Sequence, residues 1–342
     1  MKILSLLVLL TCFMSIIGCK KDINALQVQT PYTYDNQYYT NLRAYKQTNH
    51  VLFYGYYAAY APIQGATGNK ESASWGERIM GLPDSVDVVN LWMGIPTKDW
   101  QPLALADMQY CQTTKGTRFV SHQDASNIAQ FVRAAGDTVK IIDSASITAY
   151  GQYIVDLVNN NNINGVDLDY EPSSGVWTTS NNFVILIKYI GQFFGPLGTH
   201  PDKLLCIDFY SANPPAATGP YASYFVRQAY SQNTGNVQNA TNLQNYYNSN
   251  ATTVPPGKFI VEENFGDFAA MGGTPFTEAN GNTLTTDGTL MYSLEGMARW
   301  NPTQGKKGGF GAYYFDRDYY STTGIPYYNV RRCIQIVNPA AH

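Results

Sequence analysis

The chain has 342 residues, a net charge of -3 and a pI of about 5.8, so it lacks the basic surface of nucleic-acid-binding proteins. Charged residues make up only 14%, below the roughly 25% typical of globular domains, whereas tyrosine occurs 27 times. Aromatic rings suit the C–H faces of sugars, and a tyrosine hydroxyl can bond sugar oxygens. The composition therefore favours a carbohydrate ligand, although most of these rings are expected to fill an ordinary core.

The N-terminus has the three parts of a secretory signal peptide. Lys2 precedes an apolar run over residues 3–17, which ends at Gly18 and Cys19. Residues 16–19 resemble a bacterial lipobox, in which the cysteine is lipidated and becomes the first mature residue; an ordinary signal peptide is the alternative. We expect a protein of the cell envelope, at the outer membrane surface, that touches the membrane only through its lipid. The expected divisions are a signal peptide (1–18), a lipidated tether (19–45) and one domain (46–342).

The remaining cysteines and the histidines give no sign of a metal site. Cys111, Cys206 and Cys333 are far apart in the sequence and form no Cys-x-x-Cys motif, which argues against a disulfide framework or a zinc site. We expect them to be small buried side chains, with one bridged pair left open. The four histidines are scattered along the chain, and no metal or organic cofactor is called for.

Strand and helix signals alternate from about residue 46 to the end, which predicts a parallel sheet. The length after the tether is near the roughly 250 residues of a TIM barrel, so the expected fold is a single α/β domain, a (β/α)8 barrel. The predicted strands cover residues 50–56, 85–92, 117–121, 162–172, 204–210, 224–230, 258–264 and 308–316. The predicted helices cover residues 100–112, 124–135, 141–158, 182–194, 290–300 and 328–337.

The fourth predicted strand places three carboxyl groups on one face. Side chains alternate along a strand, so Asp167, Asp169 and Glu171 point one way and the apolar residues between them point the other. Repulsion between like charges at this spacing raises at least one pKa, and a carboxyl protonated near neutral pH is a general acid. Pro172 ends the strand and leaves Glu171 at its carboxyl end, where barrel enzymes hold their active sites.

This strand resembles the signature of glycoside hydrolase family 18, Asp-Gly-x-Asp-x-Asp-x-Glu. Gly165 and the three acids match, whereas Asn164 replaces the first aspartate, a change expected to tune the site without abolishing it. The resemblance implies retaining, substrate-assisted hydrolysis, in which Glu171 is the general acid and base. Asp169 would bond the substrate's acetamido N–H, and Asp167 would pair with Asp169. The alternative for three acids in a row is an exposed acidic strand or a cation site.

The resemblance also implies substrate-binding residues on other strands. Gln228 and Tyr230 are similar to a Gln-x-Tyr motif that contacts the N-acetyl group in several members. The alternative for Tyr230 is an ordinary aromatic residue at the rim of the barrel. Tyr313 stands where the family's chitinases carry a tryptophan, and Tyr54 of the first strand joins the predicted set.

A tyrosine in place of that tryptophan favours the endo-β-N-acetylglucosaminidase branch, which cuts the chitobiose core of N-glycans. The expected partners are therefore glycans or glycoproteins that contain N-acetylglucosamine. Two alternatives remain open, a chitinase and a surface glycan-binding protein that uses the same barrel without turnover. Non-hydrolysing members of the family usually lose the glutamate, and Glu171 is present here.

Overall fold

A computed structural model describes the chain over residues 33–62, 74–125, 128, 133–135, 139–172, 180–231 and 238–339. One compact unit begins at Thr33. The predicted signal peptide, the lipobox cysteine Cys19 and the beginning of the predicted tether lie outside the described residues.

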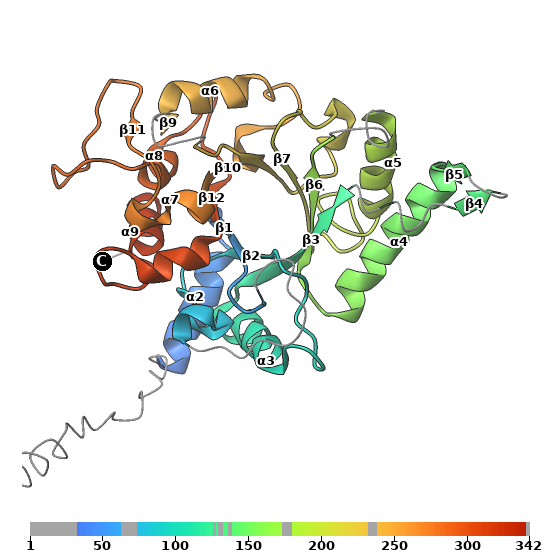
Figure 1. The fold of residues 1–342 in the computed structure, drawn as a ribbon, viewed down its shortest axis with the longest axis horizontal. Coiled ribbons are helices and arrows are strands. Elements are labelled where there is room, and N and C mark those ends of the chain that lie inside the picture. Colours follow the sequence, from blue (N-terminus) through green and yellow to red (C-terminus); the bar gives the residue numbers. More distant parts are fainter. Residues whose placement is uncertain are drawn as a thin grey trace, which may run out of the picture. The chain divides into compact units, whose positions relative to one another are not determined.

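Eight parallel strands close into one barrel, as predicted, in the order β1-β2-β3-β6-β7-β8-β10-β12 (Figure 1). Each of them overlaps a predicted strand: β1 (Leu52–Tyr57), β2 (Val88–Leu91), β3 (Arg118–Asp124), β6 (Gly165–Tyr170), β7 (Leu204–Phe209), β8 (Tyr224–Gln228), β10 (Phe259–Asn264) and β12 (Gly309–Tyr313). The first strand pairs with the last from Leu52 opposite Gly309 to Gly55 opposite Ala312, and this pairing closes the ring.

Helices surround the barrel, and five of them overlap predicted ones: α3 (Pro102–Tyr110), α4 (Ser144–Asn160), α5 (Ser180–Ile190), α8 (Ser293–Arg299) and α9 (Tyr328–Val337). Three more are α2 (Asn36–Lys46), α6 (Ala240–Asn248) and α7 (Phe265–Phe268). The described residues also contain short 3-10 or π-helical segments: η1 (Trp75–Glu77), η2 (Ile79–Gly81), η3 (Cys111–Lys115), η5 (Ala216–Thr218), η6 (Pro256–Lys258), η7 (Ala269–Met271) and η8 (Phe315–Tyr320). No helix in the described ranges is long and apolar enough to cross a bilayer.

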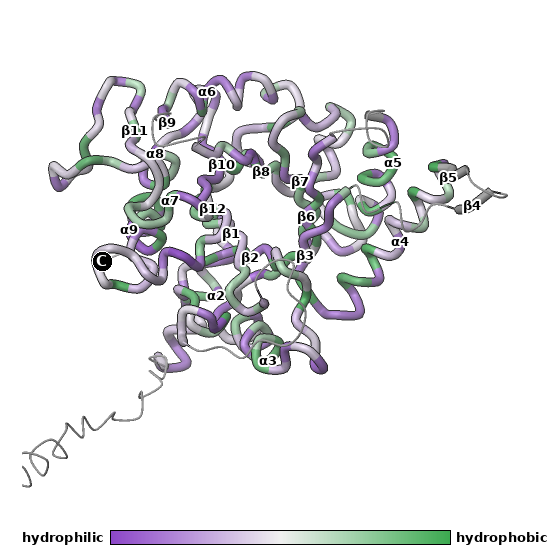
Figure 2. The backbone as a smooth tube through the Cα atoms, in the orientation of Figure 1, coloured by the Kyte–Doolittle hydropathy of each residue, from purple (hydrophilic) through white to green (hydrophobic). Residues whose placement is uncertain are grey.

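The main core lies between the barrel and its helices. Hydrophobic and hydrophilic stretches alternate along α4 and α5, which gives each helix an apolar face (Figure 2). The apolar residues between the three acids of β6 face this core, and the ring of Tyr170 lies 4.3 Å from that of Phe183 on α5. All three described cysteines are buried and free, so the alternative of a bridged pair is excluded.

The predicted helix over residues 124–135 is wrong at both ends. Strand β3 continues to Asp124 because it pairs with β6 as far as Asp169. Strand β4 (Arg133–Ala135) then pairs antiparallel with β5 (Val139–Ile141), a small sheet outside the barrel. Two more short strands, β9 (Gln238–Asn239) and β11 (Phe276–Thr277), form a second small sheet, in which they pair parallel.

The predicted boundary between the tether and the domain, at residue 45, lies too far along the chain. Helix α2 occupies the last part of the predicted tether and is packed on the barrel domain. Asp35 caps this helix by accepting a hydrogen bond from the Tyr38 N–H at 2.8 Å. At its other end the buried Lys46 ammonium donates to the Val86 carbonyl at 2.7 Å and to the Thr117 hydroxyl at 3.0 Å. The sequence looked like a tether because α2 is polar and buries few of its side chains.

Replacing Lys46 with alanine should destabilise the domain by about 1–3 kcal/mol, since the buried Val86 carbonyl loses its charged donor. Urea unfolding of the parent and of Lys46→Ala measures this difference. Lys98→Ala, at an exposed position, is the matched control. Equal midpoints for Lys46→Ala and the parent would mean that α2 is not part of the cooperative unit.

Candidate active site

The first two motif positions shape the amino end of β6, far from its exposed tip. The Asn164 side-chain oxygen accepts hydrogen bonds from the Phe119 N–H and the Gln112 amide, both at 2.9 Å. Gly165 has φ +146°, and a Cβ there would collide with the backbone of Leu204 on β7. The departure at Asn164 therefore changes a strand-joining contact, not the part of the strand that faces solvent.

Asp167 lies at the centre of the barrel and is fully buried. One of its oxygens accepts three hydrogen bonds, from the hydroxyls of Tyr54 (2.6 Å) and Tyr56 (2.7 Å) and from the Asn90 amide (2.8 Å). Burial raises the pKa of this carboxyl, while the three donors oppose the rise because they stabilise its charged form. Three side-chain donors thus hold this buried carboxyl in place.

Asp169 and Glu171 follow on the same face, each nearer to solvent than the one before. Burial, and next the charge of Glu171 and then those of Asp124 and Asp167, raise the pKa of Asp169 to about 8. This is the raised pKa that the row of acids predicted, and it leaves Asp169 largely protonated at neutral pH. Glu171 is exposed at the carboxyl end of β6.

A cavity of about 200 Å³ opens at the carboxyl ends of the strands. Its lining combines three acids, one amide and four aromatic rings: Tyr56, Trp92, Asp169, Glu171, Asp208, Gln228, Tyr230 and Tyr313. The Tyr313 ring lies 5.1 Å from that of Trp92 and 5.9 Å from that of Tyr230. The structure therefore brings Gln228, Tyr230 and Tyr313 together with both outer acids of the motif, from three different strands and their carboxyl ends.

The prediction of Tyr54 as a substrate-binding residue is wrong. Tyr54 is fully buried below the cavity, where its hydroxyl is used by Asp167. Tyr56, two residues later on the same inner face, lines the cavity instead. Alternation along a strand shows which face a side chain occupies but not its depth in the barrel.

Sequence reasoning missed two further acids inside the barrel, Asp208 and Glu262. Asp208 accepts a hydrogen bond from the Gln228 amide at 2.9 Å, and burial and then the charges of Asp167 and Asp169 raise its pKa well above normal. Burial, and then Asp167, do the same for Glu262, whose two oxygens have no hydrogen-bond partner among the described residues. The available signal was a carboxyl at an inward position of a predicted barrel strand.

Two residues of neighbouring strands complete one wall of the site. Trp92 follows the end of β2, so the cavity does contain a tryptophan, although not from the eighth strand. His122 on β3 lies 4.3 Å from the Trp92 ring, and burial lowers its pKa to about 4. This wall is therefore aromatic and uncharged at neutral pH.

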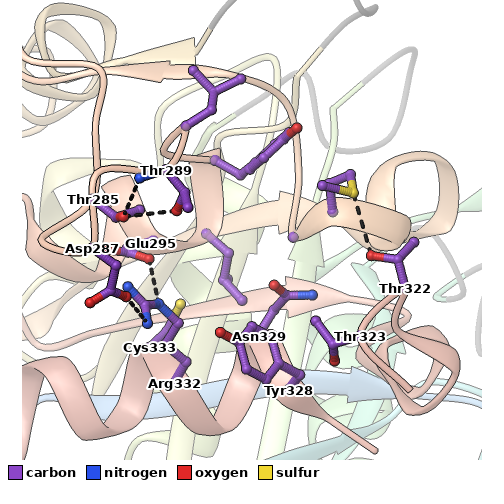
Figure 3. A pocket seen from close by; sticks show the side chains of 15 residues that line it. Thr285, Asp287, Thr289, Glu295, Thr322, Thr323, Tyr328, Asn329, Arg332 and Cys333 are labelled. Atoms are coloured by element: carbon purple, nitrogen blue, oxygen red, sulfur yellow. Dashed lines mark hydrogen bonds and ion pairs between the residues drawn. The ribbon is translucent and has the colours of Figure 1, made fainter. Parts of the chain in front are cut away.

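A second cavity, of about 330 Å³, lies on the outside of the barrel between α8, α9 and the loop before α8 (Figure 3). Both acids of its lining have a basic partner, because Arg332 binds Asp287 at 2.8 Å and Glu295 at 2.9 Å. The barrel-mouth cavity differs in having a row of acids without basic partners in its lining. Nowhere in the described part of the chain do three or more His, Cys, Asp or Glu side chains form a group that could hold a metal ion.

One family profile and one curated relative each match most of the chain. The sequence profile described as glycoside hydrolase family 18, BT1044-like, matches residues 20–336. Endo-beta-N-acetylglucosaminidase F2 of Elizabethkingia meningoseptica is 29% identical over 313 residues, which are 88% of this chain and 85% of that protein.

Two solved structures share the fold. The structure of BT1044 gives a TM-score of 0.66 at 19% identity and covers 89% of this chain and 93% of its own. The endo-beta-N-acetylglucosaminidase of Cordyceps militaris gives 0.62 at 21% identity, with 90% and 98% covered.

The raised pKa of Asp169 predicts a stability that falls as pH rises. In the folded protein Asp169 holds its proton up to about pH 8, whereas in the unfolded chain it loses it near its ordinary value of 3.8. Its contribution to stability is therefore complete below about pH 4 and is lost progressively up to about pH 8. Asp169→Asn removes this loss. The melting temperature of Asp169→Asn minus that of the parent should therefore increase as the pH rises from about 4 to about 8. Asp156→Asn, on an exposed position of α4, should show a constant difference; the same result for Asp169→Asn would contradict the raised pKa.

Proposed function

Because the chain belongs to glycoside hydrolase family 18 and is a glycosidase, we propose that it is an endo-β-N-acetylglucosaminidase. Its substrate is the β-1,4 bond between the two N-acetylglucosamines in the chitobiose core of N-glycans. One observation carries the proposal: exposed Glu171 stands beyond protonated Asp169 in a cavity lined by aromatic rings.

Glu171 is the acid that solvent and substrate can reach. It protonates the glycosidic oxygen as the bond to the anomeric carbon breaks. Asp169 holds a proton at neutral pH, so it is a poor nucleophile, and the carbonyl oxygen of the substrate's own 2-acetamido group attacks the anomeric carbon instead. Water that gives its proton to Glu171 then opens the oxazolinium ion, and the configuration is retained.

Asp169 serves the acetamido group. The carbonyl oxygen of the protonated Asp169 carboxyl accepts a hydrogen bond from the acetamido N–H, which orients that group as the oxazolinium ring forms. Asp167, held by Tyr54, Tyr56 and Asn90, lies below it on the same face of β6 and is fixed in place by these three donors. The chemistry needs no second carboxylate at the anomeric carbon.

The other lining residues hold the reacting sugar. The rings of Trp92, Tyr230 and Tyr313 offer flat apolar faces to the sugar's C–H groups. Gln228 is fixed by its hydrogen bond to Asp208, so its amide reaches the cavity in one orientation. These contacts fit the N-acetylglucosamine next to the bond that is cut.

Similarity to endoglycosidases favours the N-glycan core over chitin. The curated relative is named an endo-beta-N-acetylglucosaminidase and spans most of this chain. A variant of the Cordyceps militaris enzyme was solved in complex with fucosyl-N-acetylglucosamine-Asn, which is a ligand of that protein. The intact acidic row, with Glu171 at its tip, argues against a binding protein without turnover.

Glu171→Gln should lower the hydrolysis rate by about 10²–10⁴-fold, because the amide cannot donate the catalytic proton. Residues 20–342 are incubated with glycoproteins that carry complex or high-mannose N-glycans, and separately with chitin oligomers. Mass spectrometry of the products measures released glycans and the single N-acetylglucosamine left on the protein. Glu278→Gln, in the loop before α8, is the matched control and should keep full activity.

Each result selects one function. Release that leaves one N-acetylglucosamine on the protein supports the proposal, and the glycans released give the arm preference. Cleavage of chitin oligomers alone means a chitinase. Binding of glycans without release by the parent protein contradicts the proposed activity and leaves a glycan-binding protein.

We further propose that the mature chain is lipid-anchored through Cys19 in the cell envelope, at the outer membrane surface, since residues 16–19 resemble a lipobox. Expression in a bacterium with a labelled fatty acid should give a labelled protein in the membrane fraction. Cys19→Ser should lose the label, whereas Cys12→Ser, inside the predicted signal peptide, should keep it. Labelling of Cys19→Ser at the parent's level would contradict the proposal.

A further inference from the structure

Tyr230 lies beyond the last strand residue that could hold it. Strand β8 ends at Gln228, two residues before Tyr230, so no barrel ladder fixes its backbone. Its ring nevertheless lines the cavity, 6.3 Å from the ring of Tyr210 and 5.9 Å from that of Tyr313. Burial, and then the charges of Glu262 and Asp208, raise the pKa of Tyr230, so its hydroxyl keeps its proton next to the acids. Some other contact must set the position of this side chain.

Glu263, near the end of β10, anchors the residue that follows Tyr230. It is fully buried, and one carboxylate oxygen accepts the N–H groups of Ser231 at 2.9 Å and Asn264 at 2.7 Å. The other oxygen accepts the hydroxyls of Ser231, at 2.7 Å, and of Ser293 at the start of α8. A buried carboxylate with four donors is fully satisfied and holds its partners in a defined geometry.

Further contacts extend this anchor to both sides of Tyr230. The Ser231 hydroxyl lies 2.7 Å from that of Thr274, whose N–H donates to the Ser293 hydroxyl at 3.0 Å. On the preceding residue, the Ala229 carbonyl accepts a hydrogen bond from the Gln238 amide at 2.6 Å. We call Ser231, Glu263, Thr274 and Ser293 the Glu263 clip; it joins the ends of β8 and β10 to α8.

We propose that Glu263 is a positioning residue, which acts through Ser231 to hold Tyr230 in the cavity. This inference rests on the proposed function, in which Tyr230 contacts the substrate. Glu263 itself does not line the cavity. A displacement of about 1 Å in a reacting assembly can cost about 10²-fold in rate, so loss of the clip affects turnover although every lining side chain remains.

The clip distinguishes between two substitutions of Glu263. Glutamine keeps a carbonyl oxygen for the two N–H donors, and its NH₂ group faces two hydroxyls that can turn to accept. Glu263→Gln should therefore stay within about threefold of the parent. Glu263→Ala leaves the Ser231 N–H without its acceptor, and its kcat should fall by about 10- to 100-fold with a smaller change in KM.

A double-mutant cycle with Tyr230→Ala separates positioning from general loss of stability. If Glu263 acts through the Tyr230 side chain, Glu263→Ala should change kcat by less than about twofold in the Tyr230→Ala background. The substrate is a glycoprotein whose N-glycans the parent protein releases. An equal fall in kcat in both backgrounds would overturn the proposal.

Amide hydrogen exchange tests the clip independently of activity. Glu263→Ala should speed exchange at residues 229–231 and leave the amides of β6 protected as in the parent. If Glu263→Ala does not fold, Ser293→Ala and Ser231→Ala, which each remove one hydroxyl from the clip, replace it in both measurements. If the parent shows no hydrolysis, the proposed function fails, and amide exchange alone tests whether Glu263 holds the segment around Tyr230. Unchanged exchange at residues 229–231 in Glu263→Ala would then overturn the proposal.

Discussion

The hydrogen-bond donors of the barrel interior are distributed unequally among its carboxyl groups, and this imbalance organises the site. Asp167 receives three hydrogen bonds, Asp208 receives one from Gln228, and Glu262 has none from the described residues. A buried charge without partners is costly, so the acids with few donors hold protons. Burial raises the pKa of Asp167 as well, but its three donors oppose that rise.

That arrangement gives the acids of β6 different environments although they share one face. Asp167 is enclosed, Asp169 lies at the cavity wall with its pKa raised to about 8, and Glu171 is exposed. A protonated Asp169 is unsuited to attack, whereas an exposed Glu171 is suited to exchange protons with substrate and water. The acids of this one strand thus have different roles because they lie at different depths in the barrel. Aromatic residues from four other strand ends close the cavity around them.

The sequence predicts the barrel well because the residues of each strand have a pattern that indicates a strand locally. Period-two alternation placed the three acids on the inner face of β6, and the breaker Pro172 located Glu171 at its tip. It could not give depth, so Tyr54 was predicted in a cavity that Tyr56 lines. Contacts between distant segments were equally hidden: nothing near Asn36 shows that α2 is held by Lys46, and nothing near Tyr230 points to Glu263.

The central claim, that the substrate's acetamido group is the nucleophile above a protonated Asp169, is tested most directly by the configuration of the first product. Proton NMR during the first turnovers on an N-glycan substrate distinguishes the two anomers of the released reducing end before they equilibrate. The account predicts that the β anomer appears first, because two displacements retain configuration. Initial formation of the α anomer would mean a single displacement by water and would contradict it.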